Sequence, residues 1–148
     1  MVKIMKKIAI ACDRAGIELK DFLIKNTSSE EFIFMDLGTN SQDPVDYPDY
    51  AKKVVKSILN KEADCGVLVC GTGIGMSISA NRYKGIRASV CHNSLEAKLT
   101  REHNDANILC MGARIIGNET ALENLKVFLN TDFAGGRHLR RIEKIEEL

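Results

Sequence analysis

The sequence predicts an α/β fold, a three-layer α/β/α sandwich of Rossmann-like type around a five-stranded, mainly parallel sheet. Two observations carry this prediction. Short apolar strand patterns alternate with helical patterns five times along the 148 residues, with short connectors between them. Right-handed crossovers between such units leave the strands parallel and bring their carboxyl-terminal loops together at one edge. The length predicts a single domain over residues 1–148.

The five predicted strands are the apolar runs at 7–13, 31–37, 64–70, 86–91 and 107–111. Each is followed by apolar residues at helical spacing. A polar loop over 38–48 contains both prolines and precedes the second helix. Ser94 is the expected N-cap of the fourth helix, and a glycine pair introduces a last helix over about 137–147.

The composition predicts a cytoplasmic protein. The formal net charge of +1 argues against a nucleic-acid or membrane-surface binder, which would carry a basic excess. No apolar run approaches the roughly 20 residues that span a bilayer, and the N-terminal segment lacks the pattern of a signal peptide. The five cysteines are odd in number and lie mostly in apolar strand patterns, which favours reduced thiols over a disulfide framework.

The third strand ends in Cys70 and opens into the alternating glycines of Gly71-Thr72-Gly73-Ile74-Gly75. A glycine-rich turn before a helix presents backbone N–H groups that suit anionic oxygens. The spacing is not that of a dinucleotide fingerprint, and no G-K-[ST] follows for a nucleoside triphosphate. Two interpretations remain: a tight packing turn, or an oxyanion site with a reactive thiol at its edge.

Two other features suggest chemistry. His103 closes the helix before the fifth strand, and we expect it in the same layer as the Cys70 loop, within reach of a shared cleft, unless it is a plain surface histidine. Arg137 and Arg141 are four apart at the start of the last helix, where cations oppose the helix dipole. They predict a phosphate site or, alternatively, a solvated basic face. The packing stripe of that helix is expected at Leu139, Ile142, Ile145 and Leu148.

Several motifs in order resemble the type B ribose-5-phosphate isomerases, within the wider ribose/galactose/allose phosphate isomerase family. They cover nearly the whole chain. The motifs are Cys12-Asp13-x-Ala15-Gly16, Asp46-Tyr47-Pro48, Cys70-Gly71-Thr72-Gly73-Ile74-Gly75, His103-Asn104-Asp105-Ala106-Asn107, Gly112-Ala113-Arg114 and Gly135-Gly136-Arg137-His138.

The resemblance implies an aldose–ketose isomerase that works on ribose 5-phosphate and ribulose 5-phosphate in the pentose phosphate pathway, without a metal or organic cofactor. It implies that Cys70 moves a proton between C2 and C1 through an enediolate, supported by Thr72. His103 would be the acid/base that opens the sugar ring. The implied substrate-binding residues are Asp13, Arg14, Tyr47, Gly71, Thr72, Gly73, Ile74, Gly75, Asn104, Arg114, Arg137, His138 and Arg141.

Members of this family are homodimers, so the resemblance also implies a second subunit, reached by the C-terminal helix, and leaves a tetramer open. One residue departs from the family pattern. Arg14 stands where histidine is usual, so it keeps a cation but cannot titrate near neutral pH. Two alternatives therefore stay open: an isomerase of allose 6-phosphate or galactose 6-phosphate, and a sugar-phosphate sensor without activity.

Overall fold

The computed structural model describes residues 6–147 and contains a five-stranded sheet in the order β2-β1-β3-β5-β4. All neighbouring strands are parallel, which confirms the predicted fold class. The strands are β1 (Lys6–Cys12), β2 (Phe32–Asp36), β3 (Cys65–Cys70), β4 (Ala88–Val90) and β5 (Ile108–Gly112).

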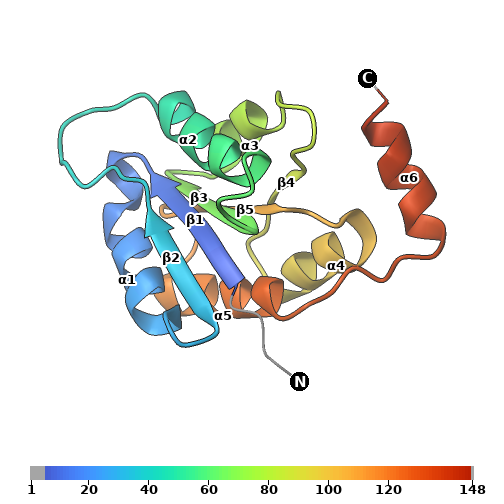
Figure 1. Cartoon of the computed structure of the whole chain (residues 1–148). Coiled ribbons are helices and arrows are strands. Elements are labelled where there is room, and N and C mark those ends of the chain that lie inside the picture. Colours follow the sequence, from blue (N-terminus) through green and yellow to red (C-terminus); the bar gives the residue numbers. More distant parts are fainter. Residues whose placement is uncertain (1–5, 148) are drawn as a thin grey trace.

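Helices cover both faces of this sheet (Figure 1). One face carries α1 and α5 with part of α4, and the other carries α2 and α3. A short 3-10 helix, η1 (Arg14–Gly16), leads into the first of them. The helices are α1 (Ile17–Thr27), α2 (Tyr47–Leu59), α3 (Ile74–Ala80), α4 (Ser94–Asn104), α5 (Asn118–Leu129) and α6 (Arg137–Ile145).

The central strand β3 is buried along its whole length, as expected for a strand covered by helices on both faces. Its residues alternate between the two apolar clusters because successive side chains of a strand point to opposite faces. Val67 and Val69 pack toward α1 and α5, whereas Leu68 and Cys70 pack toward α2 and α3. This alternation directs the Cys70 thiol to the α2–α3 side of the sheet.

Two local expectations are wrong. The N-cap of α4 is Asn93 rather than Ser94, because the Asn93 carboxamide oxygen accepts the backbone N–H of Glu96. The loop predicted over 38–48 is shorter, because Pro48 lies in the first turn of α2, where its missing N–H costs no hydrogen bond.

The C-terminal helix α6 stands beside the body of the domain, at the end of a long connecting segment (Figure 1). Of its predicted packing stripe, only Ile142 is buried, while Leu139 and Ile145 remain about half exposed. The fourth position, Leu148, lies outside the described residues. The stripe therefore presents apolar surface that its own chain leaves uncovered.

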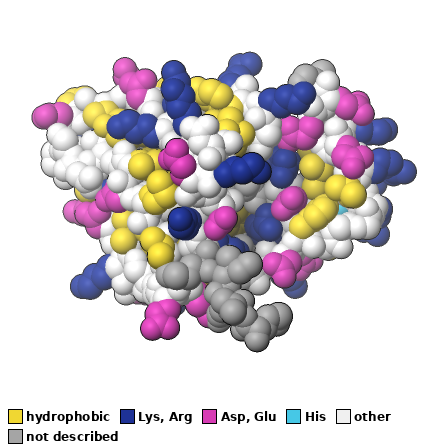
Figure 2. Space-filling model, in the orientation of Figure 1, with side chains coloured by type: hydrophobic (Ala, Val, Ile, Leu, Met, Phe, Trp, Pro, Cys, Tyr) yellow, Lys and Arg dark blue, Asp and Glu magenta, His cyan; other side chains and the backbone are white. Residues whose placement is uncertain are grey.

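Acidic and basic side chains are mixed over the face of the molecule shown in Figure 2, with small apolar areas between them. This matches the near-neutral net charge of the sequence. None of the helices in the described part of the chain is long and apolar enough to cross a membrane.

Candidate active site

The Cys70 thiol lies at the carboxyl-terminal edge of the sheet, at the start of the glycine loop 71–75. Its Sγ accepts the backbone N–H of Gly73 at 3.1 Å. An N–H directed at sulfur stabilises negative charge on it, as a reactive thiolate requires. The side chain is otherwise enclosed, with about 5% of its surface exposed.

The shape of this loop depends on Gly73, which adopts φ +79°, a conformation that L side chains rarely adopt. A Cβ at this position would also lie 2.9 Å from the carbonyl carbon of Met111 in β5. The next turn is closed by Thr72, whose Oγ1 accepts the N–H of Ile74 at 3.2 Å. Close packing on β5 and the hydrogen bond to Sγ thus depend on the same glycine.

Two side chains cover the glycine loop from outside. The Tyr47 ring, at the start of α2, packs over Gly75, since a Cβ there would lie 2.7 Å from Cε1 and Cζ of the ring. The Arg114 side chain lies over Gly71 in the same way, with Cδ, Nε and Nη1 at 3.4–3.5 Å from an added Cβ. The backbone N–H of Arg114 donates to the Gly71 carbonyl at 3.0 Å, which fixes the turn after β5 against the loop.

The end of β1 borders the same loop. The N–H of Asp13 donates to the Val69 carbonyl, and the Asp13 carboxylate accepts the N–H of Ala15 as the cap of η1. Arg14 follows on the surface of η1 and is exposed. The structure therefore brings together at one edge the predicted site residues Asp13, Arg14, Tyr47, Gly71, Thr72, Gly73, Ile74, Gly75, Cys70 and Arg114.

The other four cysteines are, like Cys70, buried. Desolvation raises the pKa of the Cys12 and Cys65 thiols to about 12 each. It also raises the pKa of Cys91 and of Cys110, the latter with further contributions from Cys70 and Cys91. These four thiols are thus held protonated at neutral pH, as expected of core residues.

A second group of predicted residues gathers around α4 and α6. The imidazole rings of His103 and His138 are stacked, with centroids 4.4 Å apart and planes 16° from parallel. Desolvation, followed by the nearby charges of His103, Arg137 and Arg141, lowers the pKa of His138. Asn104 is the last residue of α4, and Arg137 and Arg141 lie exposed on α6.

The expectation that His103 shares a cleft with Cys70 of its own chain is wrong. Cys70 pairs with Gly112 at the end of β5, whereas His103 and Asn104 precede Ile108, the first residue of that strand. The two groups therefore lie at opposite edges of the sheet, separated by the length of β5, about 13 Å. A helix that leads into a parallel strand ends at the amino-terminal edge, so the topology alone determines this separation.

No role was predicted from the sequence for His92, which lies beside the end of β5. Its Nε2 accepts the N–H of Gly112 at 3.0 Å, which anchors the turn that leads to Arg114. Such a hydrogen bond needs the tertiary structure to be recognised. Within residues 6–147, no three His, Cys, Asp or Glu side chains are grouped as ligands for a metal ion.

Residues 8–145 match the Ribose/Galactose Isomerase family. The chain belongs to this family. It is 43% identical over 141 residues to ribose-5-phosphate isomerase B of Escherichia coli (strain K12), with 95% of each chain covered. It is 47% identical over 142 residues to a putative sugar phosphate isomerase of Bacillus subtilis (strain 168), again with 95% of each chain covered.

The fold of this ribose/galactose isomerase family member also matches solved structures. A crystal structure of a ribose 5-phosphate isomerase from Thermotoga maritima superimposes with a TM-score of 0.94 and is 55% identical in sequence. The match covers 97% of this chain and 99% of the other. The similarity therefore extends over α6 as well as the sheet.

Proposed function

We propose that this protein, a sugar-phosphate aldose–ketose isomerase by family, interconverts ribose 5-phosphate and ribulose 5-phosphate in the cytoplasm, as a step of the pentose phosphate pathway. The observation that carries the proposal is the Cys70 thiol with its Gly73 N–H contact, at the edge of a loop built from backbone amides. The relatives named ribose-5-phosphate isomerase support ribose 5-phosphate as the substrate. The loop of backbone amides beside the thiol supports proton transfer through an enediolate.

In the proposed reaction, the Cys70 thiolate removes the C2 proton of the open-chain aldose, and the electron pair moves to form an enediolate. The same thiol then returns a proton to C1 while the proton on O2 passes to O1, and the ketose results, so that no proton or electron is gained overall. The N–H groups of Gly73 and Ile74 are already engaged with Sγ and Thr72 Oγ1. We assign the remaining amides of the loop to the enediolate oxygen, where such donors supply much of the catalysis.

A single chain does not bring all the proposed residues together, and we infer that a second copy completes the site. Cys70 and Arg114 lie at one edge of the sheet, while His103 and the α6 arginines lie toward the other. The exposed Leu139 and Ile145 of α6 offer the apolar surface that a partner subunit would bury. Each site of the homodimer then combines the Cys70 loop of one chain with α4 and α6 of the other.

This arrangement assigns the substrate's two ends to different chains. The phosphate is held by Arg137 and Arg141 of α6 together with Arg114 of the neighbour, since guanidinium groups bind phosphate through paired hydrogen bonds. Asp13 and Tyr47 orient the sugar beside Cys70. His103, with Asn104 and His138, then opens the ring. Phosphate binding remote from the reacting carbons fixes the open-chain sugar in a reactive pose.

Pairing of two inactive variants tests the shared site. Cys70→Ala and His103→Ala would each abolish turnover. Unfolding and refolding an equal mixture would give hybrid dimers with one intact site each, and about a quarter of wild-type activity would return. A mixture that stays inactive, although hybrid dimers are detected by mass spectrometry, would contradict a site shared between subunits.

A hexose 6-phosphate is the second candidate substrate, and the observation that favours it is Arg14, an exposed cation beside Asp13. The test is kcat/KM for ribose 5-phosphate, allose 6-phosphate and galactose 6-phosphate under the same conditions. We expect the pentose to be preferred. A clear preference for either hexose would overturn the pentose assignment, and saturable binding of all three without turnover would indicate a sensor.

A further inference from the structure

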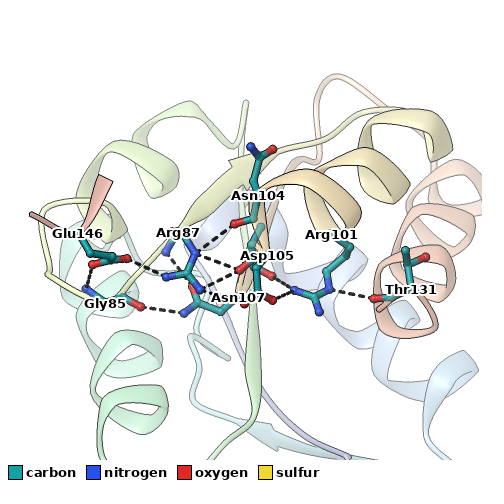
Figure 3. A network of polar contacts seen from close by, with 9 residues as sticks. Gly85, Arg87, Arg101, Asn104, Asp105, Asn107, Thr131 and Glu146 are labelled. Atoms are coloured by element: carbon teal, nitrogen blue, oxygen red, sulfur yellow. Dashed lines mark hydrogen bonds and ion pairs between the residues drawn. The ribbon is translucent and has the colours of Figure 1, made fainter. Parts of the chain in front are cut away.

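The guanidinium group of Arg87 connects three parts of the chain (Figure 3). Its Nε donates to the backbone carbonyls of Asn104 and Asp105, both at 3.1 Å, and Nη2 donates to the Asp105 carbonyl at 3.0 Å. Its Nη1 donates to Glu146 Oε1 at 2.7 Å. One side chain therefore contacts the end of α4 and the residue that follows α6.

Glu146 is held from two directions. Besides the ion pair with Arg87, its Oε2 accepts the backbone N–H of Gly85 at 3.0 Å. The segment that presents both partners is itself braced by Asn107, which accepts the Arg87 N–H and donates to the Gly85 carbonyl. The carboxylate thus docks on a rigid surface at the beginning of β4, visible at the left of Figure 3.

The end of α4 is held equally firmly. Asp105 adopts a left-handed conformation with φ +45°, which asparagine and aspartate tolerate better than other L residues. Its carboxylate pairs with Arg101 at 2.8 Å and lies 3.5 Å from Arg87. The Arg101 side chain also donates to the carbonyls of Ala106 and Thr131. The turn that carries Asn104 is therefore fixed from both sides.

The helix α6 has few other attachments to its own chain. Ile142 is buried, and His138 stacks on His103, but the apolar residues on either side of Ile142 are exposed. The histidine stack holds the first turn and Glu146 holds the last. Arg141 lies between these two anchors. Loss of the second anchor would leave the last turn of this nine-residue helix less firmly held than its first turn.

We propose that Arg87 and Glu146 are positioning residues for catalysis. Their ion pair locks α6 to the end of α4, so that the phosphate-binding arginines and the His103–Asn104 pair enter the neighbouring subunit's site as one rigid unit. The inference rests on the proposed function. Arg87 and Glu146 can act as positioning residues only if the α6 arginines and the His103–Asn104 pair bind one substrate. The inference adds two residues that touch no substrate themselves.

The experiment compares Glu146→Gln with Glu143→Gln. Both variants remove one negative charge from the same end of the molecule, but Glu143 is exposed on α6 and takes no part in the ion pair. We expect Glu146→Gln to raise the KM for ribose 5-phosphate about five- to tenfold, with kcat changed less than about twofold. Glu143→Gln should leave both constants at the wild-type value.

Binding of inorganic phosphate, measured by calorimetry, separates this proposal from the proposed function. The measurement needs no turnover, so it remains informative even if ribose 5-phosphate is not a substrate. We expect the dissociation constant to rise about five- to tenfold in Glu146→Gln and to stay unchanged in Glu143→Gln. Equal phosphate affinity in Glu146→Gln and the wild type, or loss of the dimer in that variant, would overturn the positioning role.

Arg87→Lys provides a second, independent variant. Lysine can pair with Glu146, but it lacks the planar fork that also holds the two carbonyls at the end of α4. We expect it to lower kcat as well as raise KM, because the His103 segment loosens. Adding Glu146→Gln to Arg87→Lys should then raise KM by a smaller factor than Glu146→Gln does in the wild type. Fully additive effects would show that the two residues act separately.

Discussion

Replacing Gly75 with alanine would displace Tyr47 without disturbing the helix that carries the glycine. The added Cβ would lie 2.7 Å from two atoms of the Tyr47 ring, which is ~0.7 Å inside ordinary van der Waals contact. The Tyr47 side chain is 40% exposed, so the ring has room to swing outward. Gly75 lies in α3 without a positive φ, so alanine imposes no backbone strain there.

The expected effects on stability and activity therefore diverge. Alanine favours a helix over glycine by about 0.5–1 kcal/mol, which offsets the cost of moving the ring, so the unfolding free energy should change by less than about 1 kcal/mol. A substrate-orienting side chain displaced by about 1 Å loses much of its effect, and we expect kcat/KM to fall about 10- to 100-fold.

Isomerase assays with ribose 5-phosphate and urea unfolding measure these two quantities. The matched control is Gly75→Ala in a Tyr47→Ala background, where no ring remains to collide with the new methyl group. In that background, Gly75→Ala should lower kcat/KM by a further factor of less than about two, because coupled residues give non-additive effects. An equal loss in both backgrounds, or wild-type kcat/KM in Gly75→Ala, would refute the reasoning.

Three further predictions concern titration and the core. Iodoacetamide near neutral pH should alkylate Cys70 before the other four cysteines, because burial holds those four thiols protonated. Ribose 5-phosphate should slow the alkylation of Cys70, and peptide mass mapping measures both the order of alkylation and its rate. Because the pKa of His138 lies below its ordinary 6.5 in the folded state, the unfolded chain binds more protons, so the unfolding free energy falls as pH drops through 6.5. His138→Gln should flatten that slope in urea titrations, and an unchanged slope contradicts the assignment. Lys20→Met should cost about 1–3 kcal/mol by thermal unfolding, because it removes the hydrogen bonds that the buried Lys20 Nζ donates to Asp36 at 2.8 Å and to Asn40 at 2.7 Å; a loss below about 0.5 kcal/mol would contradict this.

The five strands and their parallel direction could be predicted from the sequence, because local apolar patterns mark the strands and the helical patterns between them indicate parallel crossovers. The order of the strands in the sheet was not predicted. β3 is a continuous apolar run that ends in a glycine turn, and the structure places Cys70 at the carboxyl-terminal edge as expected. The α4 cap was misassigned by one residue, since Asn93 and Ser94 are both good caps and only the backbone geometry separates them.

The separation of His103 from Cys70 follows from the topology of the sheet rather than from the motifs. His103 belongs to a helix that leads into β5, so its end lies opposite the edge that carries Cys70. The motifs identified both groups of residues but could not show that one chain keeps them apart. The sequence also gave no sign of Arg87 or Glu146, which are 59 residues apart and meet only in the folded chain.

The packing stripe of α6 shows a further limit of periodicity. The spacing of Leu139, Ile142 and Ile145 correctly indicates one apolar face on a helix. Periodicity does not say which surface covers that face. In the structure Ile142 is buried, whereas Leu139 and Ile145 remain about half exposed.

The central claim is that Cys70 transfers the proton between C2 and C1, and hydrogen exchange with solvent tests it most directly. In D₂O, the wild-type enzyme should convert ribose 5-phosphate to ribulose 5-phosphate with deuterium appearing at C1, as measured by NMR. Cys70→Ala should show neither turnover nor deuterium incorporation, while calorimetry shows that it still binds ribose 5-phosphate. Turnover with deuterium incorporation at the wild-type rate in Cys70→Ala would contradict the account.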